Sequence, residues 1–251
     1  MLRPCAPVPN GAVKETIVCV PPSGCGVGAF SGAFAEAMAA TGREVVAVDV
    51  PGRPGSSDRE LWRHGVVELG RAIADALHAC QSRVILYGHS VGAWMAFEAA
   101  AARPSVVSRL VVSGARAPRL GHWLNDPDEL TPRLSTIDDD DTFWCAFERR
   151  YGASRELRHH RTAMVDSLRN DFEMVENYAG SETKLSIPLT AIGIRNDDRT
   201  TTETIEQWSS HADSFSSMYY GDVNEPHAHR VLLDQPSDFA TFLARDVLDA
   251  S

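Results

Sequence analysis

The sequence predicts an α/β fold, in which helices cover both faces of a mostly parallel β-sheet. Short runs of β-branched and apolar residues alternate along the chain with longer amphipathic segments, the pattern of strand-helix-strand units. The first four runs are almost continuously apolar, so we expect these strands to be covered on both faces. The expected strands are 16–20, 44–50, 83–87, 109–113, 189–192 and 216–220, and the expected helices are 30–40, 66–79, 92–102, 202–209 and 236–248.

The length and charge of the chain limit how many domains it can form and which kinds of partner it can bind. The chain has 251 residues, of which 43% are hydrophobic, which is enough for one large core. We therefore expect residues 1–251 to form a single domain, and we expect a monomer. The 34 acidic residues outnumber the 24 basic ones, and the formal net charge of −10 repels phosphate backbones and anionic lipid headgroups. Neither nucleic acid nor a membrane is an expected partner.

The five cysteines indicate a reducing compartment. They are odd in number, widely spaced and without a C-x-x-C pair, so they predict neither a disulfide framework nor a zinc site. No apolar run in the sequence is long enough to span a bilayer. We therefore expect a cytoplasmic protein.

The alternation of strands and helices is interrupted at residues 119–186. This segment is rich in charged residues and helix formers and has no convincing strand. An insertion after the fourth expected strand would lie over the carboxyl ends of the sheet, where ligands bind in folds of this kind. We predict that residues 119–186 form a helical lid. The alternative is a peripheral helical subdomain unrelated to any site.

The strongest chemical signal is the motif Gly88-His89-Ser90-Val91-Gly92. It follows the expected strand 83–87 directly and precedes the next expected helix. Glycines without Cβ atoms allow a sharp strand-to-helix turn that holds the serine hydroxyl above the sheet. The motif therefore predicts an α/β-hydrolase fold with Ser90 as the nucleophile and the Val91 N–H as an oxyanion donor. A tight serine turn without chemistry is the alternative.

A serine nucleophile needs a base and a carboxylate that orients the base. In this fold the expected chain order is serine, acid, histidine. Asp197 and Asp198 follow the expected strand 189–192, and from the residues alone the two are nearly equal candidates for the acid. His227 and His229 follow the last expected strand, and we predict His229 as the base with His227 as the alternative. A metal site on this H-x-H pair is disfavoured, because it would leave the serine motif unexplained.

The loop after the first expected strand, residues 21–26, should supply the second oxyanion donor. Its first two residues are prolines, which have no N–H. Ser23 is therefore the expected backbone donor, with the flanking glycines allowing close approach to the reacting carbonyl. Cys25 lies in the same loop but has no histidine partner in the pattern, so we interpret it as a neighbour of the site. A glycine-rich turn with no catalytic part is the alternative.

Five blocks of the sequence carry a family resemblance. They are PPSGCG at 21–26, PGR at 51–53, GHSVG at 88–92, VSGARAP at 112–118 and LRNDFEMVENY at 168–178. On these blocks the chain resembles, over nearly its whole length, the stand-alone (type II) thioesterases that accompany polyketide and nonribosomal peptide synthases. The resemblance implies that residues 119–186 are a mobile lid over a channel for the acyl group and phosphopantetheine. It also favours Asp197 as the acid, ahead of a helix containing Trp208.

The resemblance implies hydrolysis of acyl-phosphopantetheine thioesters on acyl or peptidyl carrier protein domains, for editing or release. No cofactor is expected, since the substrate itself carries the phosphopantetheine. Two stretches depart from the family: Arg230-Val231 stand where an aromatic pair usually follows the histidine, and Ser23-Gly24-Cys25 stand where Ala-Gly-Gly is common. These two departures leave open which acyl group is the substrate and what the outcome of the reaction is. An acyltransferase or cyclase, a general carboxylesterase and a non-catalytic binding module are the alternatives.

Overall fold

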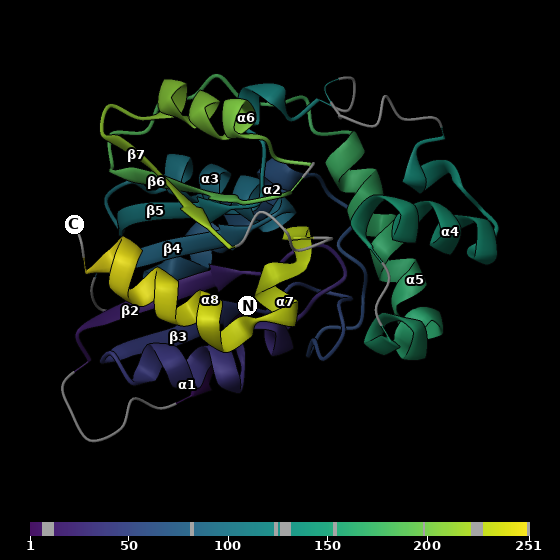
Figure 1. Ribbon diagram of the computed structural model, residues 1–251, viewed down its shortest axis with the longest axis horizontal. Helices are drawn as coiled ribbons and strands as arrows, with labels where there is room; N and C mark the ends of the chain where they lie inside the picture. Colours follow the sequence, from purple (N-terminus) through teal and green to yellow (C-terminus); the bar gives the residue numbers. More distant parts are fainter. Residues whose placement is uncertain are drawn as a thin grey trace.

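A seven-stranded sheet runs through the centre of the molecule (Figure 1). The computed structural model describes residues 1–6, 13–80, 83–122, 125, 132–152, 155–197, 199–221 and 228–249. The strand order is β1-β3-β2-β4-β5-β6-β7, and every neighbouring pair from β3 to β7 is parallel. The strands are β1 Leu2–Ala6, β2 Glu15–Val20, β3 Arg43–Val48, β4 Val84–His89, β5 Val107–Ser113, β6 Leu189–Ile194 and β7 Phe215–Tyr220. The predicted fold class is confirmed.

The first strand, β1, was not among the predicted strands. It pairs antiparallel with β3 at the edge of the sheet, and its register shifts between Pro4 and Ala6. Proline is tolerated on an edge strand because its missing N–H faces away from the ladder. A strand of this kind has neither the continuous apolar run of a buried strand nor clear alternation, so its sequence gives no strand signal.

Helices cover both faces of the sheet (Figure 1). α2 and α3 pack together on one face, and α1 and α8 pack together on the other. The helices of the two layers are α1 Ala33–Ala39, α2 Val66–Ala76, α3 Val91–Ala102, α6 Thr202–Glu206, α7 Val231–Asp234 and α8 Pro236–Phe242. Short helical turns lie at Val27–Phe30, Leu77–Ala79, Pro118–Leu120, Leu134–Thr136, Gln207–His211 and Ala228–Arg230, and a π-helical segment at Leu243–Leu248 extends α8.

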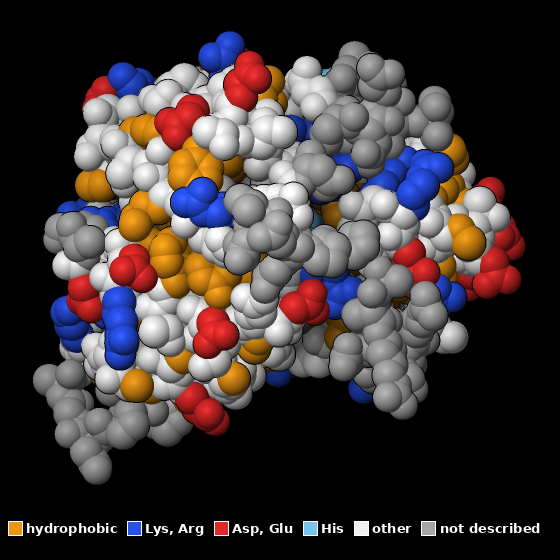
Figure 2. Space-filling view, in the orientation of Figure 1, with side chains coloured by type: hydrophobic (Ala, Val, Ile, Leu, Met, Phe, Trp, Pro, Cys, Tyr) orange, Lys and Arg blue, Asp and Glu red, His pale blue; other side chains and the backbone are white. Residues whose placement is uncertain are grey.

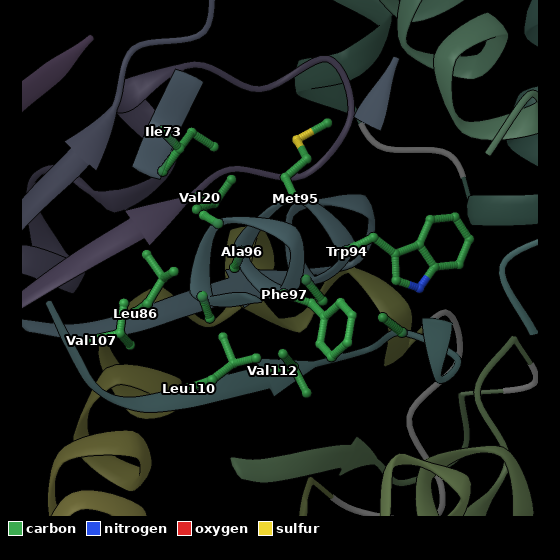
Figure 3. Packing of buried hydrophobic residues seen from close by; sticks show 14 of the residues in the cluster. Val20, Ile73, Leu86, Trp94, Met95, Ala96, Phe97, Val107, Leu110 and Val112 are labelled. Atoms are coloured by element: carbon green, nitrogen blue, oxygen red, sulfur yellow. The ribbon is translucent and has the colours of Figure 1, made fainter. Parts of the chain in front are cut away.

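The two faces of the sheet explain the continuous apolar runs of its strands. Successive side chains of a strand point to opposite faces. In β2, Val18 belongs to the core cluster under α2 and α3, whereas Ile17 and Cys19 belong to the cluster under α1 and α8. Figure 3 shows Leu86 of β4 and Leu110 of β5 directed toward α3 in the first of these clusters. Because both faces are covered, successive positions such as Ile17–Val20 of β2 and Val84–Leu86 of β4 are all apolar and buried.

The inserted segment, residues 119–186, builds its own small core. Its two main helices are α4 Asp140–Tyr151 and α5 Arg155–Glu176, which lie at one end of the sheet in Figure 1. The acidic run before α4 supplies an N-cap, since the Asp139 side chain accepts a hydrogen bond from the Thr142 N–H at 2.8 Å. The core of the segment comprises Leu134, Ile137, Phe143, Trp144, Phe147, Val165, Leu168 and Phe172.

One face of the molecule carries its charges in dispersed form. On the face drawn in Figure 2, acidic and basic side chains of the described residues are interspersed with polar and apolar ones. Only three large hydrophobic side chains of the described residues are exposed, namely Met1, Val13 and Leu233. In the same part of the chain, no helix has the length and the apolar character that crossing a membrane would require.

Candidate active site

Ser90 occupies a strained turn between β4 and α3. Its backbone has φ 54° and ψ −128°, in the region that side-chain-bearing residues rarely adopt. A Cβ on Gly88 would lie 2.3 Å from the carbonyl oxygen of Gly92, and a Cβ on Gly92 would lie 2.3 Å from that of Val20. The two glycines of the motif are therefore required by close backbone approach. The strain falls on the serine, whose hydroxyl is turned toward the cavity described below.

Three side chains from separate loops form one hydrogen-bonded chain. The Ser90 Oγ lies 3.0 Å from Nε2 of His229, and Nδ1 of His229 lies 3.0 Å from Oδ2 of Asp197. Ser90 follows β4, Asp197 follows β6 and His229 follows β7, so parallel strands deliver all three at their carboxyl ends. The structure thus brings the three predicted residues together. The alternative base His227 and the alternative acid Asp198 lie outside the described residues.

Asp197 is held as a carboxylate by the turn that carries it. Its Oδ1 accepts the Arg199 N–H at 3.0 Å, and its Oδ2 accepts the Thr200 hydroxyl at 2.6 Å as well as His229. Burial raises the pKa of Asp197, but the neighbouring His229 and these hydrogen bonds outweigh burial and lower the pKa to about 2. Asp197 is therefore ionised at neutral pH and fixes a proton on Nδ1 of His229, which leaves Nε2 free to accept one from Ser90.

The side chain of His89, the residue before Ser90, bonds to the backbone of His229. Its Nε2 lies 2.9 Å from the carbonyl oxygen of His229, which can only accept, so Nε2 carries the proton. Its Nδ1 lies 2.8 Å from the hydroxyl of Ser113, which in turn lies 2.8 Å from the hydroxyl of Tyr87. Burial, and then the nearby His229, lower the pKa of His89 to about 3. His89 is a neutral donor that holds the backbone of His229.

The neutral state of His89 predicts acid-sensitive folding. Between its ordinary pKa near 6.5 and its folded pKa of about 3, the unfolded chain binds a proton that the folded chain does not. Stability is therefore lost as the pH falls through that window. We expect the free energy of unfolding, measured in urea, to fall by roughly 2 to 3 kcal/mol from this source between pH 7 and pH 4.5. His89→Gln keeps an N–H donor without titrating, so equal losses in both proteins would contradict the assignment.

A cavity of about 120 Å³ opens beside Ser90. The two predicted oxyanion donors, Ser23 and Val91, both line it. Among the described residues, neither backbone N–H donates a hydrogen bond to a backbone carbonyl. Cys25 also lines the cavity, and burial raises the pKa of its thiol to about 11, although the nearby guanidinium of Arg53 opposes this rise. The thiol is therefore protonated, which agrees with its interpretation as a neighbour of the site.

The inserted segment forms much of the cavity wall. The ring of Tyr151, at the end of α4, lies 5.6 Å from the imidazole of His229. The guanidinium carbon of Arg199 lies over the Tyr151 ring, 4.8 Å from its centroid. On the side of the sheet, Trp94 of α3 is fixed by a 2.8 Å hydrogen bond to the Arg116 carbonyl, and Figure 3 shows its indole at the edge of the core cluster to which it belongs. The cavity residues of the inserted segment are Phe147, Tyr151, Met164, Leu168, Phe172 and Val175.

A serine on a strand-turn-helix elbow, joined to a histidine and an aspartate above a mostly parallel sheet, defines an α/β hydrolase. The alpha/beta hydrolase family model matches residues 17–242, and the chain belongs to this family. It is 30% identical over 220 residues to thioesterase PikA5 of Streptomyces venezuelae, a match that spans 82% of this chain and 72% of that protein.

Solved structures agree with this family. RedJ, a thioesterase from the prodiginine biosynthetic pathway in Streptomyces coelicolor, is 25% identical, with a TM-score of 0.75 over 96% of this chain and 95% of its own. YbtT, a type II thioesterase from the yersiniabactin NRPS/PKS pathway, has the same fold, with 24% identity and a TM-score of 0.75 over 100% of this chain and 99% of its own. The family resemblance seen in the sequence is confirmed.

Several residues of the site were not predicted from the sequence. Thr200 and the Arg199 N–H hold Asp197, and the signal for them is an aspartate that bonds to groups two and three residues later, as in an Asx turn. The sequence analysis assigned no role to His89, and Tyr151 has no signal in the sequence. Its contact with His229 depends on the placement of the inserted segment, which local sequence does not encode.

Proposed function

We propose that this chain is a serine-dependent thioesterase that hydrolyses acyl groups from phosphopantetheine thioesters on carrier proteins. The observation that carries the proposal is the hydrogen-bonded chain from Ser90 through His229 to Asp197 at the wall of an apolar cavity. The thioester class is supported by the likeness to PikA5 and RedJ, which are thioesterases by name.

Acylation is the first half of the proposed mechanism. The Ser90 Oγ attacks the thioester carbonyl while Nε2 of His229 takes the hydroxyl proton, and the carboxylate of Asp197 stabilises the resulting imidazolium. The N–H groups of Ser23 and Val91 bind the oxyanion of the tetrahedral intermediate. When the carbon–sulfur bond breaks, His229 returns the proton to the departing thiolate, and the acyl group remains on Ser90 as an ester.

Deacylation repeats these steps with water. His229 removes a proton from a water molecule, whose oxygen attacks the acyl ester, and the same two N–H groups bind the second oxyanion. When the ester bond breaks, His229 returns the proton to the Ser90 Oγ. The products are a free carboxylic acid, a carrier protein with a free phosphopantetheine thiol, and the starting enzyme.

The inserted segment acts, in this proposal, as the lid of the acyl site. Its α4 and α5 supply apolar side chains to the cavity, and moving them would open a path for a substrate attached to a protein. An apolar cavity of about 150 Å³ holds a molecule the size of benzene. A cavity of about 120 Å³ therefore suits a short acyl group while the lid is in the position seen here.

The partners follow from the same proposal. Carrier protein domains of a biosynthetic synthase bring the acyl group, the phosphopantetheine belongs to the substrate, and the enzyme needs no cofactor of its own. We propose that it works as a monomer in the cytoplasm, where such synthases assemble their products.

The test compares one acyl group on two leaving groups. The wild-type protein is incubated with a propionyl carrier protein and with a propionyl oxygen ester, and intact-protein mass spectrometry follows loss of the acyl mass from the carrier. We expect kcat/KM for the carrier thioester to exceed that for the oxygen ester by at least roughly 10-fold, because the carrier contributes binding energy. Heat-inactivated protein is the control for spontaneous hydrolysis.

The alternatives give different outcomes in the same experiment. A general carboxylesterase would prefer the oxygen ester. An acyltransferase or cyclase would release the acyl group only as an amide, an ester or a ring, which the mass of the product identifies. A non-catalytic binding module would leave both substrates intact and would not label Ser90 with a fluorophosphonate.

A further inference from the structure

The side chain of Arg53 donates hydrogen bonds to the loop that carries Ser23. We call residues 21–26 the oxyanion loop. Arg53 follows β3, its side chain is 1% exposed, and its Nη1 donates to three carbonyl oxygens of the loop: to Pro21 at 3.0 Å, Pro22 at 3.1 Å and Cys25 at 3.3 Å. These carbonyls flank Ser23 on both sides. One guanidinium therefore sets the path of the backbone that presents the Ser23 N–H.

Asp171 of α5 holds the same loop from the inserted segment. Its Oδ2 accepts the Gly24 N–H at 2.7 Å and lies 3.1 Å from Nε of Arg53, and its Oδ1 lies 3.3 Å from the same Nε. The Asp171 side chain is 3% exposed. A buried ion pair thus joins two segments that are far apart in sequence, and both of its members bond directly to the oxyanion loop.

The oxyanion loop also packs closely against α5 and the segment after β3. Gly24 has φ +70°, and a Cβ on it would lie 2.5 Å from Cδ2 of Leu168, one turn before Asp171 on α5. A Cβ on Gly26 would lie 2.0 Å from the carbonyl oxygen of Pro54, next to Arg53. The loop is therefore enclosed between α5 and the segment after β3, with no room for side chains at its glycines.

The energetics favour a positioning role over a stabilising one. A buried ion pair pays a desolvation cost that apolar residues of similar size avoid, so it is weak evidence for stability. Among the described residues, Nη2 of Arg53 is buried without a hydrogen-bond acceptor, which adds to that cost. What the pair provides is a defined loop geometry beside Ser90.

We propose that Arg53 and Asp171 are positioning residues that shape the oxyanion loop. Through them, the position of the Ser23 N–H depends on where α5 lies. The inference rests on the proposed function, in which Ser23 donates to the oxyanion. With α5 in the position seen here, Asp171 bonds both Gly24 and Arg53 and the oxyanion hole is complete. If α5 moves away as a lid, the loop loses Asp171, so hydrolysis is favoured only while the lid covers the acyl group.

Two variants separate positioning from folding. Arg53→Lys keeps the positive charge but has a single nitrogen, so it cannot bond Asp171 as Nε does and the three loop carbonyls as Nη1 does at the same time. The double variant Arg53→Met with Asp171→Leu removes both charges together, which avoids leaving one of them buried and unpaired. The matched control is Glu176→Gln, also on α5. Glu176 pairs with Arg133 at 3.3 Å and accepts the Leu134 N–H at 2.8 Å, within the inserted segment and away from the oxyanion loop.

Each variant is assayed for kcat and KM on a carrier thioester and on a p-nitrophenyl ester. The affinity for an acyl trifluoromethyl ketone, which forms a tetrahedral adduct with Ser90, is measured beside them. We expect Arg53→Lys and the double variant to lose roughly 10- to 100-fold in kcat and the same factor in ketone affinity, with KM changed less than about threefold. Glu176→Gln should lower Tm without either loss.

The outcomes decide between this proposal and its failure. Folded Arg53→Lys and double variants with wild-type kcat and ketone affinity would overturn it, and so would a loss of kcat without a loss of ketone affinity. If the double variant does not fold, Arg53→Lys alone decides. If the wild-type protein spares carrier thioesters, the proposed function has failed, and the ester and ketone measurements still test the role of Arg53 and Asp171.

Discussion

Replacing either Ser90 or His229 by alanine is expected to lower kcat for thioester hydrolysis by roughly 10⁴-fold or more, and replacing both is expected to lower it no further. The two side chains are 3.0 Å apart and act as a unit, because the hydroxyl attacks only as its proton passes to Nε2. Once one partner is gone, the other has nothing left to contribute. Steady-state kinetics on a carrier thioester, with labelling of the Ser90 hydroxyl by a fluorophosphonate as a second readout, would measure this non-additivity.

His227→Ala is the matched control for this prediction. It removes a histidine two residues before His229 in the sequence, and its kcat should stay within about threefold of the wild-type value. The opposite pattern, in which His227→Ala is inactive and His229→Ala is active, would move the role of base to His227. A double variant that falls well below both single variants would show that Ser90 and His229 contribute independently.

The sequence predicted those parts of the fold whose signal is local. Central strands covered on both faces, such as β2 and β4, contain unbroken apolar runs, and the elbow at Ser90 requires glycines at fixed offsets, so both are visible in a short window. The edge strand β1 has no such signal, because half of its surroundings are solvent and its central residue is a proline.

The residues of the site likewise fall into those that the sequence predicts and those that only the structure reveals. The loops that carry Ser90, Asp197 and His229 were predictable because parallel strands bring the residues after their carboxyl ends to one edge of the sheet, whereas the choice of Asp197 over Asp198 came from the family resemblance. Asp171 was not, since its role depends on α5 crossing the oxyanion loop more than a hundred residues away in sequence. Family blocks marked the stretches around Arg53 and Asp171, but only the geometry shows that the two side chains meet.

Asp197→Asn is expected to lower kcat by roughly 10³- to 10⁴-fold while leaving KM nearly unchanged. The structure gives the reason, since all three groups around this carboxylate are donors: the Arg199 N–H on Oδ1, and the Thr200 hydroxyl and His229 on Oδ2. An asparagine has one acceptor oxygen and one amide nitrogen. Whichever way it turns, the nitrogen faces a donor that the carboxylate had satisfied.

The two orientations of the asparagine have different consequences. If its nitrogen faces the Arg199 N–H, the turn after β6 is destabilised by two opposed donors. If its nitrogen faces His229, it donates to Nδ1 and shifts the imidazole proton to Nε2, which then has no lone pair for the proton of Ser90.

The matched control for Asp197→Asn is Asp213→Asn, which makes the same chemical change at an exposed carboxylate paired with Lys184 at 2.5 Å. Its kcat should equal that of the wild-type protein, because an exposed ion pair contributes little and lies outside the cavity. Parallel kcat and KM measurements on the carrier thioester compare the two variants. If Asp197→Asn kept wild-type kcat, another acidic residue would have to orient His229, and Asp198, the next residue in the sequence, would be the next to replace.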